Sequence, residues 1–214
     1  MYNKLFAKVF GWMFIGLMIT FSTAYYVSNS ETMIQNIFST SLYWIIFILE
    51  FALVVFLSSR AMKMQYSTAA IVFCLYSFVT GLTFSVFFLM FTMESILFIF
   101  ALTAIIFGIF SLLGFLTNID LSKYSTILFM GLIGIIIASL VNIFIGNTTL
   151  ELIISWVTVG LFVGMTAYDV QKIKRLLDYG VNQNNMAIVG ALELYLDFIN
   201  IFISLLRIFG NSKD

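Results

Sequence analysis

Long apolar stretches alternate with short polar segments along the whole chain. A helix needs about 20 residues to cross the hydrocarbon core of a bilayer, and each stretch is close to that length. Seven spans are predicted, over residues 9–28, 38–58, 68–91, 95–116, 124–146, 150–169 and 187–209. The connections between them are too short to hold a second domain. The pattern therefore predicts one polytopic membrane domain over residues 1–214, an all-α bundle of seven transmembrane helices.

The composition supports this prediction and narrows the possible chemistry. Of the 214 residues, 62% are hydrophobic and only 9% are charged, whereas a soluble domain needs far more charge on its surface. The net charge is zero and no basic block occurs, so nucleic acid is not an expected partner. Histidine and proline are absent, which rules out histidine metal sites, histidine-dependent catalysis and proline kinks. The single cysteine, Cys74, lies in an apolar run and is predicted to be a packing residue.

The distribution of lysine and arginine predicts the orientation of the spans. Counted alternately from the amino terminus, eight of the ten basic residues fall on one side, and Arg207 and Lys213 fall on the other. Cytoplasmic loops carry the excess of basic residues, so the amino terminus is predicted inside and the carboxyl terminus outside. A last segment that re-enters instead of crossing would place all ten on the cytoplasmic side. That alternative stays open.

Small residues recur at intervals that allow close helix packing. In the fourth and fifth spans they are Ala101, Ala104, Gly108 and Ser111, followed by Gly131 and Gly134. These positions are predicted to form packing surfaces between helices.

The last span carries the clearest polar pattern. Its polar side chains follow at steps of four, three, four and three: Glu193, Asp197, Asn200, Ser204 and Arg207. At 100° per residue they form one narrow stripe, which must face the bundle interior or water because lipid cannot hydrogen-bond it. A cavity lining is the favoured interpretation. An interhelical hydrogen-bond seam and an amphipathic surface helix are the alternatives.

Asp169, in the preceding span, is the expected partner of Asp197. If the sixth helix continues to about residue 177 and the next begins near 186, an antiparallel hairpin brings both carboxylates to a similar level. Two carboxylates in a low-dielectric site cannot both ionise cheaply, so the pair is expected to share a proton and to titrate as a unit. Such a pair is a pH switch built without histidine. The alternative is that Asp169 only forms an interfacial salt bridge with Lys172.

Two residues of the second span complete the candidate set. Glu50 lies in the middle of the span among apolar residues, where an ionisable side chain is costly. It is either hydrogen-bonded to another helix or part of the same cavity. Arg60, at the cytoplasmic end of that helix, is placed to neutralise the aspartate pair as a latch. Alternatively, Arg60 extends to the lipid headgroups.

The carboxyl-terminal hairpin resembles the Bax inhibitor family, also called the transmembrane Bax inhibitor-motif family, and most of all its bacterial members. The resemblance rests on segments 168–173 (YDVQKI) and 194–200 (LYLDFIN), together with the seven-span length of the chain. It implies a bundle whose last helix is central and surrounded by the others. It also implies a pH-sensitive calcium leak across the bacterial plasma membrane.

The resemblance also implies roles for individual residues. Asp169 and Asp197 match the paired aspartates that sense pH and close the pore, and Glu50 matches an acidic residue of the second span. Arg60 is the natural basic partner, although the residues after it interrupt what is often a denser basic cluster. Glu193 adds an acid near the inner mouth. The predicted ion pathway is thus formed by Asp169, Asp197, Glu50, Glu193 and Asn200.

The leading hypothesis is a pH-sensitive, calcium-permeable leak channel with calcium ions and protons as its ligands and no resident cofactor. Calcium takes six to eight oxygen ligands, and the candidate side chains supply too few for a tight site. Loose coordination at Asp169 and Asp197 suits permeation, which needs weak binding. The alternatives are a proton-coupled transporter of unknown substrate and a non-transporting regulatory membrane protein. The sequence does not identify protein partners.

An enzyme is not expected. Intramembrane aspartyl proteases also place one aspartate on each of two successive helices, but they resemble this chain only at Tyr168 and Asp169. Their second aspartate follows a glycine pair, whereas residues 194–196 (LYL) precede Asp197 here. Their Pro-Ala-Leu element is impossible in a chain without proline.

Overall fold

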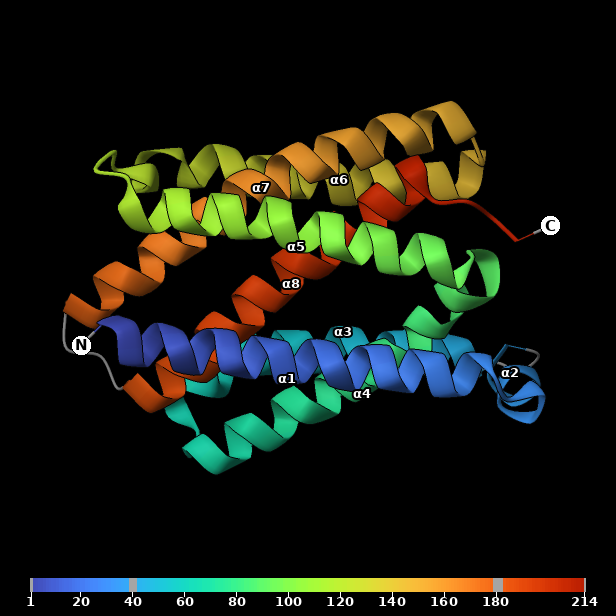
Figure 1. The fold of residues 1–214 in the computed structure, drawn as a ribbon, viewed down its shortest axis with the longest axis horizontal. Coiled ribbons are helices and arrows are strands. Elements are labelled where there is room, and N and C mark those ends of the chain that lie inside the picture. Colours follow the sequence, from blue (N-terminus) through green and yellow to red (C-terminus); the bar gives the residue numbers. More distant parts are fainter. Residues whose placement is uncertain (1, 39–41, 179–182, 214) are drawn as a thin grey trace. The chain divides into compact units, whose positions relative to one another are not determined.

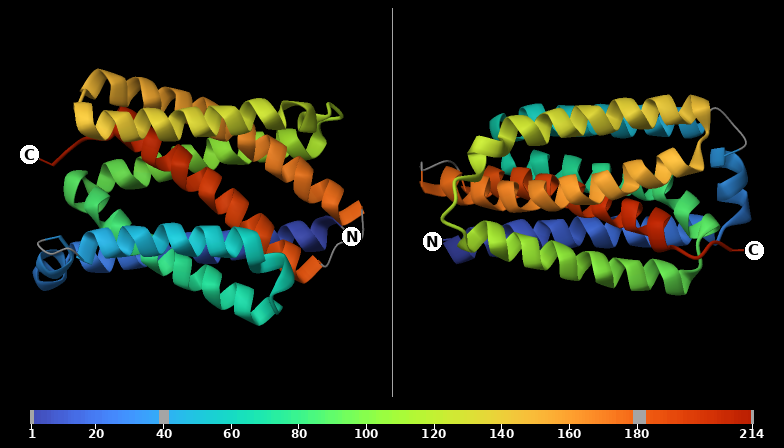
Figure 2. Two further views of the ribbon diagram at one scale, coloured as in Figure 1. Left: turned by 180° about the vertical axis from the view of Figure 1, so that it is seen from behind. Right: turned by 90° about the horizontal axis from the view of Figure 1, so that it is seen from above.

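The computed structural model describes residues 2–38, 42–178 and 183–213, and its regular elements are helices (Figures 1 and 2). These elements are α1 (Tyr2–Ser28), α2 (Glu31–Phe38), α3 (Leu42–Arg60), η1 (Ala61–Lys63), α4 (Tyr66–Met90), α5 (Met93–Leu116), η2 (Leu121–Tyr124), α6 (Ser125–Ile145), α7 (Thr148–Asp178) and α8 (Gln183–Phe209). Within the described residues, seven helices are long and apolar enough to cross a membrane. The predicted class, an all-α bundle of seven transmembrane helices, is confirmed.

Several helices are longer than the predicted spans. α1 begins at Tyr2 instead of residue 9, and α7 continues to Asp178 instead of residue 169. Both extensions contain lysines, which a hydropathy pattern assigns to the loops although a helix continues through them. The predicted start of the second span at residue 38 is wrong, because Phe38 ends the separate helix α2 and α3 begins at Leu42. α2 has only two turns with mixed polarity, too short for its pattern to stand out.

The described residues form two compact units. The first contains α1 to α4, α8 up to Tyr195 and residues 212–213. The second contains α5 to α7 and α8 from Leu196 onward. Within the first unit α4 packs against α1 and α3, and within the second α7 packs against α5 and α6. The prediction of a single domain over residues 1–214 stays a prediction.

α8 takes part in both units and is the most buried of the seven spans, with 72% of an 18-residue stretch buried. In the first unit the buried Tyr195 packs edge-on against Tyr76, and its hydroxyl lies 2.6 Å from that of Thr20. In the second unit the ring of Phe198 packs against Phe107. The last helix is therefore buried, as predicted, and contributes to the packing of each unit.

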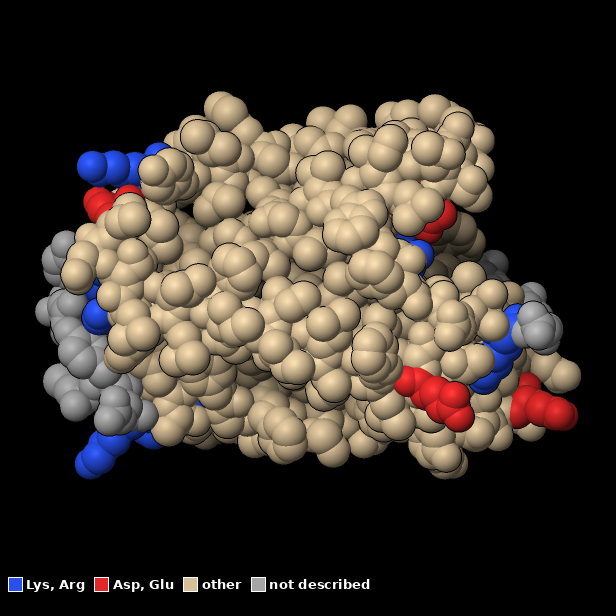
Figure 3. Space-filling view, turned by 45° about the horizontal axis from the view of Figure 1, so that its top comes forward, with Lys and Arg blue, Asp and Glu red and all other residues tan. Residues whose placement is uncertain are grey.

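Apolar side chains also cover the outer surface of the helices. None of the residues of α6 is buried, although this helix is strongly apolar. The face shown in Figure 3 carries its lysine, arginine and acidic side chains near helix ends, with uncharged surface between them. An apolar surface of this extent is stable only against lipid.

A glycine brings α5 and α7 into backbone contact. A Cβ atom on Gly114 would lie 2.2 Å from the carbonyl oxygen of Ala167, well inside contact distance. The helices therefore meet where neither backbone is covered by a side chain. Small residues allow this kind of approach in membrane helices, where the apolar driving force between helices is weak.

The predicted packing face of the fourth span is largely wrong. Ala101 and Ala104 are exposed, and a Cβ atom on Gly108 would have no neighbour within 4 Å. Ser111 is buried, as predicted. In the fifth span a Cβ atom on Gly131 would meet a side chain of α7, whereas one on Gly134 would meet nothing. Small residues occur on several faces of these helices, so their spacing alone does not identify the contact.

Side chains of α7 hold the loop that joins α5 to α6. The buried Gln171 accepts a hydrogen bond from the Leu121 N–H at 2.9 Å and donates one to the Ile119 carbonyl at 2.8 Å. Arg175, one turn further along α7, donates to the carboxylate of Asp120 and to the Gln171 side chain. We call these contacts of Gln171 and Arg175 with residues 119–121 the loop clamp. It begins two residues after Asp169, the first of the predicted gating aspartates.

The carboxylate of Asp120 is the charged centre of the loop clamp. The Ser122 hydroxyl donates to it at 2.6 Å and, together with the Arg175 guanidinium, lowers the pKa of Asp120 to about 2. Lys174 adds a hydrogen bond to the Phe115 carbonyl at 2.9 Å and lies over the ring of the same residue. Asp120 therefore stays ionised at neutral and moderately acid pH.

Substituting Gly114 with alanine should destabilise the protein by about 1–3 kcal/mol, because the new methyl group meets backbone atoms that cannot rotate away. Gly108→Ala, on the same helix, is the matched control. It should be neutral or slightly stabilising because its surroundings are open and alanine favours a helix. Thermal unfolding of both variants in one detergent tests this. Equal melting temperatures would contradict the close contact between α5 and α7.

The loop clamp should resist acid. A lowered carboxyl pKa contributes stability that is complete above the ordinary value for aspartate and is lost only as the pH falls toward about 2. Hydrogen exchange of residues 117–124, corrected for intrinsic rates, should therefore show constant protection between about pH 5 and about pH 8. Gln171→Leu should reduce that protection throughout this range, and Asp120→Asn should reduce it less. Loss of wild-type protection within the range would show that another group controls the loop.

Candidate functional site

The two aspartates predicted to gate the protein lie in the second unit on successive helices. Asp169 on α7 is 5% exposed and Asp197 on α8 is 1% exposed. Both take part in polar interactions within the structure. Lys172, which is half-buried, does so too, and both interpretations of Asp169 stand. Carboxyls buried this deeply in apolar helices are rare unless they are paired or functional.

The packing of α8 explains why Asp197 is buried. It lies between Tyr195, which packs in the first unit, and Phe198, which packs in the second. Ser204, two turns further along, is buried as well. These positions rule out an amphipathic helix on the membrane surface. The 27 residues of α8 form one helix of about 40 Å, a length that suits a full crossing.

The two aspartates lie at different distances along their helices from the ends that face each other in the sequence, and the prediction that they reach a similar level stays a prediction. α7 ends nine residues after Asp169, and α8 begins fourteen residues before Asp197. These intervals correspond to about 14 Å and about 21 Å along the two helices. The prediction began α8 near residue 186, but the polar residues 183–185 already belong to it. The two distances therefore differ by about 7 Å.

The remaining residues of the stripe differ in their surroundings. Glu193 is half-buried in the part of α8 that belongs to the first unit. Asn200 is half-buried in the second unit, and its amide donates to a carbonyl of its own helix at 2.8 Å. Arg207, near the end of α8, is exposed and lies 3.6 Å from the carboxylate of Glu151. The stripe is thus buried in its middle and exposed at this end.

Glu50 is hydrogen-bonded to a neighbouring helix. Its Oε2 atom lies 2.9 Å from the hydroxyl of Thr83 on α4, in the first unit. This is one of the two interpretations of Glu50, and its partner has no signal in the sequence. The predicted ion-pathway residues therefore divide between the two units: Glu50 and Glu193 belong to the first, and Asp169, Asp197 and Asn200 to the second. Their roles in a pathway stay predictions.

Arg60 is the exposed last residue of α3, also in the first unit. The turn that follows it is tied to α8 by the buried side chain of Asn185. Its Nδ2 atom donates to the carbonyls of Ala61 at 2.9 Å and Met64 at 2.6 Å. An amide nitrogen carries two protons, so it can satisfy both acceptors. Sequence reasoning missed Asn185, whose only signal is the polar run 183–185. The latch role of Arg60 stays a prediction.

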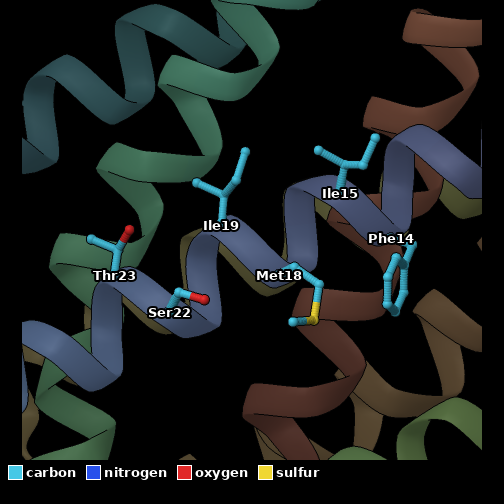
Figure 4. Close-up of a pocket in the computed structure, with 6 residues that line it drawn as sticks. All are labelled: Phe14, Ile15, Met18, Ile19, Ser22 and Thr23. Atoms are coloured by element: carbon cyan, nitrogen blue, oxygen red, sulfur yellow. The ribbon is translucent and has the colours of Figure 1, made fainter.

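Two further features bear on ligand binding. Among the described residues, no three cysteine or acidic side chains gather closely enough to hold a metal ion. A groove of about 460 Å³ runs along α1, where Figure 4 shows its lining residues. They are Phe14, Ile15, Met18, Ile19, Ser22 and Thr23. The groove is largely apolar and includes none of the predicted site residues. A weak two-carboxylate calcium site at Asp169 and Asp197 stays a prediction.

Comparison with known proteins supports the membrane fold. The chain matches the family described as inhibitor of apoptosis-promoting Bax1 over residues 2–214. It is 42% identical to the inner membrane protein YbhL of Escherichia coli K12, covering 97% of this chain and 91% of that protein. An uncharacterized protein of Borreliella burgdorferi is 46% identical, over 99% and 94% of the two chains. An uncharacterized membrane protein of Streptococcus pyogenes serotype M1 is 34% identical, over 98% and 93%. The chain is an integral membrane protein and belongs to the Bax inhibitor family.

Proposed function

We propose that this protein is a pH-sensitive, calcium-permeable leak channel in which Asp169 and Asp197 form the gate. The observation that carries the proposal is the burial of two carboxyls, 5% and 1% exposed, on successive membrane helices of one compact unit. Ionisable groups at such positions usually belong to an ion or proton path. Membership of the Bax inhibitor family adds to this support.

The proton carried by the aspartates is the proposed switch. When the pair holds a proton, the carboxyls attract each other and stabilise the closed arrangement of α7 and α8. When the proton leaves, two negative charges in a low-dielectric site repel each other and become acceptors for a cation. Flux is therefore expected to increase as the pH rises. Neither aspartate is proposed to act in catalysis.

Calcium is proposed as a permeant ion and not as a resident cofactor. Calcium takes six to eight oxygens, more than the candidate side chains supply. No tight cluster of acidic residues occurs among the described residues either. Partial coordination by Asp169 and Asp197, completed by water, suits an ion that must leave as readily as it enters.

The proposed location is the bacterial plasma membrane, with the amino terminus in the cytoplasm. The excess of lysine and arginine on one side of the spans supports this orientation. Bacterial relatives such as the inner membrane protein YbhL support the location. The loop clamp of α7 then faces the cytoplasm. Protons reaching the aspartates from that side would report the cytoplasmic pH.

Asp197→Asn should abolish or strongly reduce pH-dependent calcium flux, because an amide cannot release the proton that opens the gate. Asp169→Asn should change the pH dependence. The measurement is calcium flux into proteoliposomes of the full-length protein between about pH 6 and about pH 8, a range in which interacting buried carboxyls titrate. Glu94→Gln, which removes an exposed acid in the same unit, is the matched control and should behave as wild type.

Wild-type flux and pH dependence in both aspartate variants would contradict the gate. Absence of flux above empty vesicles at every pH would instead favour a proton-coupled transporter or a regulatory membrane protein.

Arg60→Ala should raise the leak at about pH 6, because it removes the ion pair through which the proposed latch holds the singly protonated, singly charged aspartate pair in the closed arrangement. Arg60→Lys keeps the charge and should restore most of the wild-type behaviour. Lys63→Ala, which alters another exposed basic residue of the same turn, is the control and should leave the leak unchanged. The same flux assay serves here. An unchanged leak in Arg60→Ala would leave this arginine as a headgroup anchor.

A further inference from the structure

One hydroxyl in the first unit faces two acceptors at once. The Oγ1 atom of Thr83 lies 2.9 Å from Glu50 Oε2 and also 2.9 Å from the carbonyl oxygen of Thr80. A hydroxyl has a single proton, so it can donate fully to only one of the two. If the carboxyl of Glu50 carries a proton, it donates to Thr83 Oγ1, and the Thr83 hydroxyl donates to the Thr80 carbonyl. The contacts of Thr83 with Glu50 and with the Thr80 carbonyl are therefore both full hydrogen bonds only when Glu50 is protonated.

The position of Glu50 in α3 also disfavours a negative charge. It lies in the middle of a helix long and apolar enough to cross a membrane, and its side chain is half-buried there. Ionised carboxylates are costly in such surroundings unless a cation compensates them. A proton removes this cost without any change of fold.

The groups that face Glu50 within the first unit are neutral. They are Thr80, Thr83 and Tyr76 of α4 and Tyr195 of α8. After α4, the elements that pack most against α3 are α2 and η1. Their acidic and basic side chains, those of Glu31 and Lys63, are exposed. Among these described neighbours, no positive charge is placed to hold an ionised carboxylate.

A second hydroxyl is available for the ionised state. Thr80 is 1% exposed, and its Oγ1 atom makes no hydrogen bond of ordinary geometry among the described atoms, although it lies beside Glu50. A small rotation would let it donate to the carboxylate in addition to Thr83. Tyr195, which lies beside Thr80 as well, is bonded in turn to Thr20 of α1. The two threonines thus offer one arrangement for each protonation state.

We infer that Glu50 is a second proton-binding site of this protein, protonated in the conformation described, in which its carboxyl donates to the hydroxyl of Thr83. It belongs to the first unit, whereas Asp169 and Asp197 belong to the second. The inference does not rest on the proposed leak. If the leak exists, a neutral Glu50 removes one negative charge from its pathway, and release of the proton restores that charge.

Infrared difference spectroscopy of the full-length protein in lipid vesicles tests this inference. The measurement compares acid with alkaline pH and follows the C=O stretch of protonated carboxyls. Glu50→Gln should remove one band. Thr83→Val should shift that band toward the frequency of a less strongly hydrogen-bonded carboxyl, and Thr83→Ser should restore it. Glu94→Gln, which removes an exposed acid, should leave it in place.

Bands from Asp169 and Asp197 are separated by repeating the comparison in the double variant Asp169→Asn, Asp197→Asn. If that variant fails to fold, the loss in Glu50→Gln is measured on the wild-type background alone. A spectrum unchanged by Glu50→Gln overturns the inference. A band that is lost in Glu50→Gln but unaffected by Thr83→Val overturns the role of the hydroxyls. Both results come from the infrared spectrum, which requires no ion flux. Failure of the leak assay therefore does not test the inference about Glu50.

Discussion

Lipid offers no hydrogen bonds, and this constraint governs how the polar residues of the protein are placed. α8 carries more polar side chains than a helix in contact with lipid can hold, and it is accordingly the most buried of the spans. α6 carries no charged side chain and has no buried residue. The most and the least buried spans thus differ in the charged side chains that each must shield from the bilayer.

The same constraint explains how the α7–α8 hairpin is held. Beyond the buried aspartates, each helix of the hairpin bonds to a different interhelical connection. Gln171 and Arg175 of α7 bond to the α5–α6 loop, and Asn185 of α8 bonds to the turn that follows α3. Most of the acceptors are backbone groups, which would otherwise need water. α7 is therefore fixed near one end by contacts within the second unit, and α8 by contacts within the first.

The parts of the fold that were predictable from sequence are those with a local pattern. Apolar length predicts the spans, and steps of three and four place Asp197 on the polar side of its helix. The roles of Thr83, Asn185 and Gln171 have no such pattern, because each bonds to a group far away in the sequence. The spacing of small residues does not predict the helix contacts correctly, for a related reason. Gly108 and Gly114 look equivalent in the sequence, and only the position of α7 makes the second one a contact.

Carboxyls in this protein differ in behaviour because their surroundings differ, although their chemistry is the same. Asp120 lies in a loop, accepts hydrogen bonds from Ser122 and Arg175, and has a pKa lowered to about 2. Glu50 faces neutral hydroxyls in an apolar helix, where an ionised carboxylate has a high free-energy cost. We infer that it binds a proton for this reason. A chain without histidine can thus respond to pH through carboxyls alone, provided that some are kept ionised and others are kept out of water. The buried acids are divided between the two compact units, and α8 is the helix that takes part in both.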